Sequence, residues 1–251
     1  MFSMRLLFLI LLASVSMFFP STAFSGDLRV TPVKLFFDQQ FKNGIITVIN
    51  EGDEPIQVEI KASEWKQDAN GKDQYNPTED IIFFPKILKM EKGEQRAVRA
   101  GVKSAAVSQE KTYRLFIKEL PKATPENQGT QIRFALQFAV PIFVKPVKEE
   151  IKGKINSMTQ EAGKLKIDVH NTGNSHFRVE SVQVKGFDKK GVENFSKEIA
   201  GWYVLAGVRR TFETMIAQEV CLDTAKVSVE VKSEQLMLHD EMDIINTLCL
   251  P

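Results

Sequence analysis

Residues 132–138 read Ile-Arg-Phe-Ala-Leu-Gln-Phe, so a large apolar side chain stands at every second position. Ile132, Phe134, Leu136 and Phe138 form this apolar row, and Arg, Ala and Gln fill the positions between them. A period of two is typical of a β-strand with one strongly hydrophobic face. Such a face either covers the protein's own core or is offered to another protein. Both the fold and the function of the chain depend on which alternative holds.

The N-terminal residues predict a secretory signal peptide. Arg5 precedes an apolar run of roughly 14 residues, Leu6–Phe19, which is too short for a membrane span. Small residues at Ala23 and Ser25 place cleavage after Ser25, so residues 1–25 are expected to be removed and the chain exported. An uncleaved membrane anchor is the alternative. No later segment has the length of a membrane span, so we expect no membrane insertion of the mature chain.

The rest of the sequence is typical of an all-β protein. Short apolar runs alternate with turn signals such as Asn70-Gly71, a pattern that favours β-sandwiches. Pro32 interrupts the first run and marks either an edge position or a switch between sheets. The charged stretch 147–150 carries no pattern, and we place a domain boundary there. The sequence thus predicts an N-terminal domain over 26–147 and a C-terminal β-sandwich over 148–251.

The two cysteines, Cys221 and Cys249, both lie near the end of an exported chain, so we expect a disulfide between them. In the chain-entropy model a loop of that size stabilises the folded state by roughly 3–4 kcal/mol. A redox or metal role is a weaker alternative because no Cys-x-x-Cys pattern is present.

Composition and motifs argue against catalysis and against nucleic-acid binding. The formal net charge is +1 and the basic residues do not cluster, unlike in nucleic-acid-binding proteins. No serine-hydrolase, phosphate-loop or zinc-protease motif is present. His170 and His176 flank a turn, and we expect them to be solvated there instead of binding a metal. We therefore expect no enzyme activity and no cofactor.

A set of short motifs occurs in a fixed order along nearly the whole mature chain. The segments are Pro32–Asp38, Val48–Asn50, Pro85–Gly93 with Val98-Arg99, Phe116–Pro121, Ala135–Gln137 with Phe143–Pro146, Asn171–Asn174 and Trp202–Gly207. Together they resemble the PapD-like family of periplasmic pilus assembly chaperones, and the specificity comes from the order and spacing of motifs that are individually weak. In the second domain the resemblance points to a subgroup that serves archaic-type or spore-coat-U-like pili.

The resemblance implies two immunoglobulin-like sandwiches in an L or boomerang arrangement, located in the periplasm. It implies donor-strand complementation, in which a chaperone strand fills the groove of an incomplete pilin-like subunit before delivery to an outer-membrane usher. Ile132, Phe134, Leu136 and Phe138 would then be the inserted side chains. Family members need no cofactor. We also expect the idle protein to cap itself as a dimer, because an uncovered apolar edge aggregates.

The family usually anchors the C-terminal carboxylate of the subunit with two basic residues between the domains. Lys34 aligns with the first of them, although a lysine loses the bidentate geometry of an arginine. Pro141 aligns with the second, a lysine, and has no charge to offer. Ordinary sheet-surface charges are the alternative reading of every other candidate. Those other candidates are Arg99, Arg114, Arg133 and Lys118.

A second interpretation of the same pattern is a self-contained structural or adhesive component of a surface fibre, in which the strand at 132–138 packs inward on its own core. The two interpretations differ in whether that strand is an accessible edge in the free protein.

Overall fold

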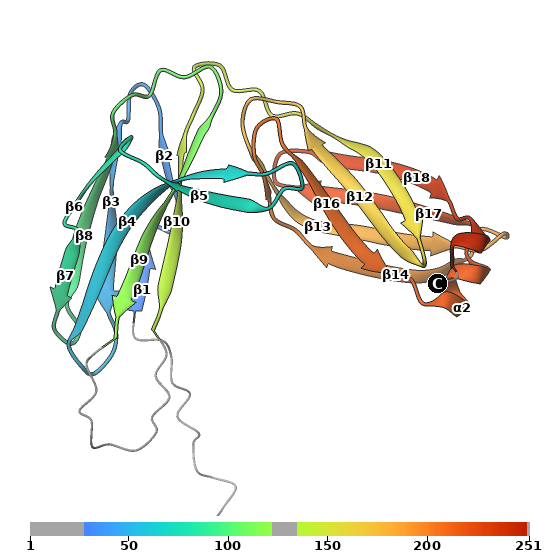
Figure 1. Cartoon of the computed structure of the whole chain (residues 1–251), viewed down its shortest axis with the longest axis horizontal. Coiled ribbons are helices and arrows are strands. Elements are labelled where there is room, and N and C mark those ends of the chain that lie inside the picture. The colour runs from blue at the N-terminus through green and yellow to red at the C-terminus, as the bar shows by residue number, and fades with distance from the viewer. Residues whose placement is uncertain (1–27, 122–134, 250–251) are drawn as a thin grey trace, which may run out of the picture.

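The computed structural model describes residues 28–121 and 135–249 of the chain, and these residues form two β-sandwich domains joined at an angle (Figure 1). Each domain contains two sheets that pack face to face. The linker between them follows the last strand of the first domain and passes over one side of the junction (Figure 1). The predicted all-β fold with two sandwiches is therefore confirmed. Within the described residues, no helix is long and apolar enough to cross a membrane.

The first domain packs a four-stranded sheet against a six-stranded one. The four-stranded sheet has the order β1 (Leu28–Thr31), β3 (Asn43–Asn50), β8 (Gln95–Val102), β6 (Ile81–Phe84). The six-stranded sheet has the order β2 (Leu35–Phe37), β10 (Gln137–Val144), β9 (Lys111–Leu120), β4 (Ile56–Gln67), β5 (Asp73–Pro77), with β7 (Ile87–Met90) also paired to β4.

Two prolines mark the points where the chain crosses from one sheet to the other. Pro32 separates β1, which is antiparallel to β3, from β2, which is parallel to β10. Pro85 separates β6 from β7 in the same way, so the mostly apolar run 81–88 forms parts of two strands in different sheets. A proline has no N–H for a ladder hydrogen bond, which favours a strand ending at each position. Of the two roles expected for Pro32, the structure has the sheet switch.

The core of the first domain is built by strict alternation in the central strands. Val58, Leu115 and Ile142 on three neighbouring strands are fully buried, and they face Val48 and Val98 of the other sheet. The residues between them point to the outer face of the six-stranded sheet. That outer face is turned toward the second domain.

The second domain follows the same plan. One sheet has the order β11 (Gly153–Glu161), β12 (Lys164–Asn171), β16 (Arg209–Met215). The other has the order β14 (Glu193–Ala200), β13 (Phe177–Phe187), β17 (Lys226–Ser233), β18 (Met237–Asp243), with β15 (Tyr203–Val204) also paired to β13. Buried valines, leucines and phenylalanines from both sheets form its core.

The predicted disulfide is confirmed and closes the far end of the second domain. Cys221 lies on α2 (Gln218–Asp223) and Cys249 on the 3-10 helix η2 (Asn246–Cys249), with their Cα atoms 5.7 Å apart. Both belong to the buried core. The side-chain amide of Gln160 on β11 contacts both sulfur atoms and the backbone of Ile245, so it fixes the bridged segment to the sheet.

Candidate functional site

Only the last two residues of the predicted strand at 132–138 lie in β10, which has a partner on both sides over only part of its length. β9 pairs with β10 from Gln137 to Val144, whereas β2 pairs only with Ile142–Val144. The N–H of Glu119 donates to the carbonyl of Leu136. This bond sets the phase of the ladder, so the backbone groups of Gln137 and Ala139 point away from β9. Among the described strands, none pairs with that part of the edge.

The same phase explains how a proline fits inside β10. Pro141 lies opposite Arg114 at a position whose backbone nitrogen also points away from β9, so no bond to β9 is lost. Because a proline has no N–H, the outer edge of β10 lacks a backbone hydrogen-bond donor at Pro141, just before the pairing with β2 begins at Ile142. Its side of the sheet faces the second domain.

The predicted donor residues lie where the first domain opens. Leu136 and Phe138 are half-buried and pack against the core of the first domain from its edge. Further along β10 the same face is closed, since Val140 and Ile142 are buried. Ile132 and Phe134 lie outside the described residues, so the apolar row can be followed only in its second half.

Aromatic side chains from both domains fill the space between the domains. Trp65 and Phe143 lie on the outer face of the six-stranded sheet, and Tyr203 and His176 come from the second domain. The Phe143 and His176 rings stack with centroids 3.7 Å apart, and Trp65 meets Tyr203 edge-on at 5.2 Å. Leu205 completes this cluster. We refer to these five residues as the aromatic junction.

His176 corrects an expectation from the sequence. Its side chain is only 12 % exposed, and it is not a solvated turn residue. Its Nδ1 lies 2.7 Å from the Glu110 carboxylate, which also accepts a bond from the His176 backbone N–H. His170 is also partly buried, and its Nδ1 has no partner among the described residues. Among those residues there is no cluster of three potential metal ligands.

Arg114 lies beneath the aromatic junction, next to the position where the family lysine is missing. Its guanidinium carbon is 3.7 Å from the centre of the Trp65 ring, and Nη1 donates to the carbonyl of Ala139 at 2.9 Å. The residue is 5 % exposed. Burial lowers the pKa of Arg114, and the nearby acidic groups Tyr75, Tyr203 and Asp73 oppose this shift. Among the described residues no carboxylate pairs with it, and its Nε has no acceptor.

Lys34 lies at the start of β2, at the rim of the same region. Its Nζ is 5.6 Å from the centre of the exposed Phe36 ring, and the Nζ of Lys145 is 5.3 Å from that same centre. Phe36 in turn stacks on Phe143 of the aromatic junction at 5.4 Å. Lys145 was not among the predicted candidates. Only the parallel pairing of β2 with the end of β10 brings Lys145 to the Phe36 ring that Lys34 also approaches, and single-strand patterns carry no signal for that pairing.

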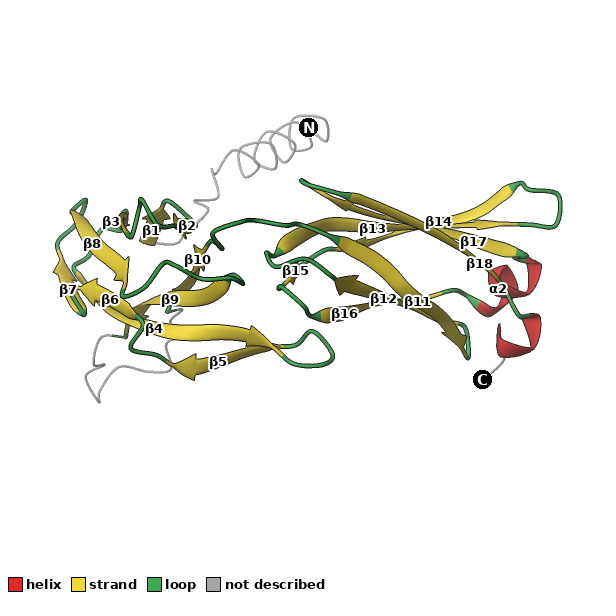
Figure 2. Ribbon diagram, turned by 90° about the horizontal axis from the view of Figure 1, so that it is seen from above, coloured by secondary structure: helices red, strands yellow, loops and turns green. Residues whose placement is uncertain are grey.

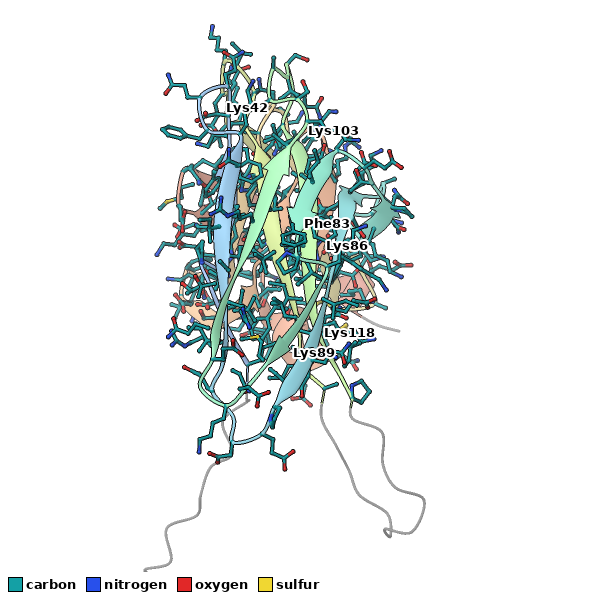
Figure 3. The ribbon with its side chains drawn as sticks, turned by 90° about the vertical axis from the view of Figure 1, so that its left-hand side faces the viewer. Lys42, Phe83, Lys86, Lys89, Lys103 and Lys118 are labelled. Atoms are coloured by element: carbon teal, nitrogen blue, oxygen red, sulfur yellow. A yellow bond between two sulfur atoms is a disulfide. The ribbon has the colours of Figure 1, made fainter. Side chains whose placement is uncertain are left out.

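The other basic candidates lie elsewhere. Arg99 is on the four-stranded sheet, where it pairs with Phe84 and Ile45 on the side away from the junction. Lys118 pairs with Gln137, near the end of β9 opposite the linker (Figure 3). Arg133 lies outside the described residues. The structure therefore brings Lys34 and Arg114 toward the aromatic junction and leaves Arg99 and Lys118 away from it.

Comparisons with solved structures show which proteins share this architecture. The CsuC chaperone of Acinetobacter baumannii, solved with the tip adhesion subunit CsuE of archaic Csu pili, has 18 % sequence identity and a TM-score of 0.59. That match covers 85 % of this chain and 98 % of the other. The Salmonella enterica SafB chaperone, in complex with the SafA pilin, has 13 % identity and a TM-score of 0.55, and the match covers 88 % and 98 % of the two chains.

The Pseudomonas aeruginosa chaperone CupB2 has 14 % identity and a TM-score of 0.52, with 86 % of this chain and 100 % of the other covered. At these identities the likeness establishes the fold. Among curated protein sequences, none matches the chain significantly. Residues 27–149 match the family described as pili and flagellar-assembly chaperone, PapD N-terminal domain. The chain thus belongs to the PapD-like family of pilus assembly chaperones, a family of chaperones and not of enzymes.

Proposed function

We propose that this protein is a periplasmic chaperone that captures incomplete pilin-like subunits by donor-strand complementation. The observation that carries the proposal is the half-paired β10, whose free edge and half-covered apolar row, Leu136 and Phe138, occur on the same stretch of backbone. An incoming strand can bond to the outward backbone groups of Gln137 and to the N–H of Ala139, whose carbonyl already accepts from Arg114. Alternate apolar side chains then enter the groove that the subunit leaves open.

The expected energies are sufficient for capture. A large apolar side chain that becomes fully buried contributes about 1.5–3 kcal/mol, and the row contains four of them. Part of this gain offsets the entropy lost on association and on ordering the strand. Because Leu136 and Phe138 are already half-buried in the free protein, their gain is smaller than that of fully exposed residues.

We further propose that the subunit's C-terminal carboxylate binds at the rim of the aromatic junction. Lys34 is exposed there. Lys145 forms a half-exposed ion pair of 3.4 Å with Glu149, and because surface ion pairs contribute little free energy, the Lys145 ammonium can bind the subunit carboxylate in place of Glu149. Arg114 adds a buried positive charge whose Nε has no acceptor among the described residues, although the Asp73 carboxylate acts on it electrostatically. In this scheme Arg114, opposite Pro141 on the neighbouring strand β9, supplies the charge that Pro141 cannot supply.

The partner classes follow from the family. CsuC was solved with a tip adhesion subunit and SafB with a pilin, which supports a pilin-like client here. We propose delivery of that client to an outer-membrane usher, and the archaic Csu relative supports the archaic-type subgroup. In the idle state, pairing of two free β10 edges would give a self-capped dimer.

The proposal is tested by co-purifying the mature protein with its small surface-fibre subunit from a periplasmic extract. Leu136→Glu puts a charge into the apolar row, whereas the control Gln137→Glu puts the same charge on the opposite, exposed side of the strand. We expect the subunit to be lost from Leu136→Glu and kept by Gln137→Glu, with both variants folded by circular dichroism.

Two results contradict the proposal. If Leu136→Glu unfolds the first domain, the row belongs to the protein's own core. If both variants retain the subunit equally, capture does not use this face of β10. A charge reversal at the proposed anchor, Lys34→Glu, should weaken capture without affecting the fold, because Lys34 is exposed.

A further inference from the structure

The hairpin of β4 and β5 extends beyond the first domain and reaches the second (Figure 2). Gln67, at the end of β4, bonds to the second domain with both ends of its side-chain amide. Its Nε2 donates to the carbonyl of Tyr203 at 2.9 Å, and its Oε1 accepts from the N–H of Leu205 at 3.0 Å. One side chain thus replaces a neighbouring strand for the backbone of β15.

The turn of the hairpin is fitted to the second domain as well. Arg210 donates to the carbonyl of Gly71, and the indole N–H of Trp202 donates to Asp73 at 3.1 Å. A Cβ atom on Gly71 would lie 2.8 Å from the Cβ of Arg210, so only glycine allows this approach. Asp73 also accepts a bond of 3.0 Å from Gln67, which orients the amide.

A separate attachment lies beside the linker. The side chain of Asn174, in the second domain, accepts from the N–H of Glu150 at 2.7 Å. It also donates to the carbonyls of Lys148 and Ser108, at 2.8 and 3.1 Å. Asn174 therefore joins the second domain to the linker and to the loop that precedes β9 in the first domain.

The two attachments lie at different places between the domains: in Figure 1 the linker crosses at the top and the β4–β5 hairpin reaches the second domain lower down. A domain rotation about the linker could preserve the Asn174 bonds to the linker residues Lys148 and Glu150, but it would pull the hairpin off the second domain. We infer that the β4–β5 hairpin is a strut that fixes the angle between the domains, with Gln67 as its positioning residue. The region between the domains is then preformed in the free protein, so a ligand bound there does not have to order the two domains. This inference does not depend on the proposed function.

The test measures the distance between the domains with a spin label in each. Lys89→Cys on β7 and Lys190→Cys in the turn after β13 are exposed sites, and the two native cysteines are bridged, so only these positions accept a label. Double electron–electron resonance of the full mature chain then gives the distance distribution. Gln67→Ala removes the two bonds to the backbone of Tyr203 and Leu205. As a control, Asn76→Ala removes an exposed amide from the same hairpin.

We expect one narrow distribution in the parent protein and in Asn76→Ala, and at least a doubling of its width in Gln67→Ala. Gly71→Ala, which forces the turn away from Arg210, should broaden it by an independent route. The inference is wrong if the parent distribution is already broad, or if both Gln67→Ala and Gly71→Ala remain as narrow as the parent.

Discussion

Replacing Phe143 with alanine should uncouple the two domains while leaving each of them folded. Phe143 lies on the outer face of β10, so its burial depends on the second domain and on its neighbours in the aromatic junction, and not on the interior of the first sandwich. It is fully buried, and its ring lies 3.7 Å from the His176 ring and 6.1 Å from the Trp65 ring, centre to centre.

The size of the effect follows from the lost ring. A phenylalanine buries about 150–250 Å², and truncation of a buried phenylalanine to alanine costs about 3–5 kcal/mol. We assign most of that loss to docking between the domains, because the inner face of β10 keeps Val140, Ile142 and Val144. A loss of this size should turn one cooperative unfolding transition into two.

Differential scanning calorimetry gives the number of transitions, and limited trypsin digestion reports on cleavage after Lys148 in the linker. The control is Phe41→Ala, which removes the same ring from a position that is 66 % exposed and should change neither readout. A single transition that moves to lower temperature as a whole, with the linker still protected, would refute this reasoning. Phe143 would then support the first domain itself.

Three further outcomes are expected. Replacing Cys221 and Cys249 with serine should destabilise the second domain by about 3–4 kcal/mol, seen as a lower melting temperature of that domain alone, since the bridge lies in its core. Gly173→Ala should prevent correct docking of the turn on the linker, because its Cβ would lie 2.2 Å from a linker carbonyl oxygen, and reduced soluble yield would report this. Burial and the bond to Asp80 raise the pKa of Tyr113 above its ordinary value of 10.0. The folded state therefore holds this proton more tightly than the unfolded state, so the associated stability is complete below about pH 10 and falls as the pH rises further; Tyr113→Phe should flatten that alkaline decline in urea titrations.

The sequence predicted those features that depend on local patterns. Alternation identified the strands, Pro32 marked a possible change of sheet, and two late cysteines behind a predicted signal peptide predicted the bridge that the structure contains. The run 81–88, which contains Pro85, was harder to interpret, because it is apolar except for Lys86 and shows no period of two in the sequence. The structure divides it into β6 and β7 in different sheets, and it buries Ile81 and Leu88 but leaves Ile82, Phe84 and Ile87 exposed.

The region between the domains could not be predicted in this way. Trp65 and Tyr203 meet in the aromatic junction although they are far apart in the sequence, and each on its own looks like an ordinary core residue. His176 looked like a turn residue because its partner, Glu110, belongs to the other domain. Lys145 ends a strand with no unusual pattern. Contacts of this kind arise from how two finished domains dock, and that information is not contained in the period of any strand.

The gradient of burial along the described part of the apolar row supports the proposed donor strand over a strand that packs wholly on its own core. A strand whose apolar face is wholly covered by its own core has no apolar surface left for a partner, and a wholly uncovered one would aggregate. In this structure Val140, Ile142 and Val144 secure the strand in the first domain, and β2 pairs with its far end. Leu136 and Phe138, on the same face, are only half covered and lie where no described strand follows β10. One strand can therefore contribute to the stability of its own domain at one end and keep apolar surface for a partner at the other, because burial is set residue by residue along its length.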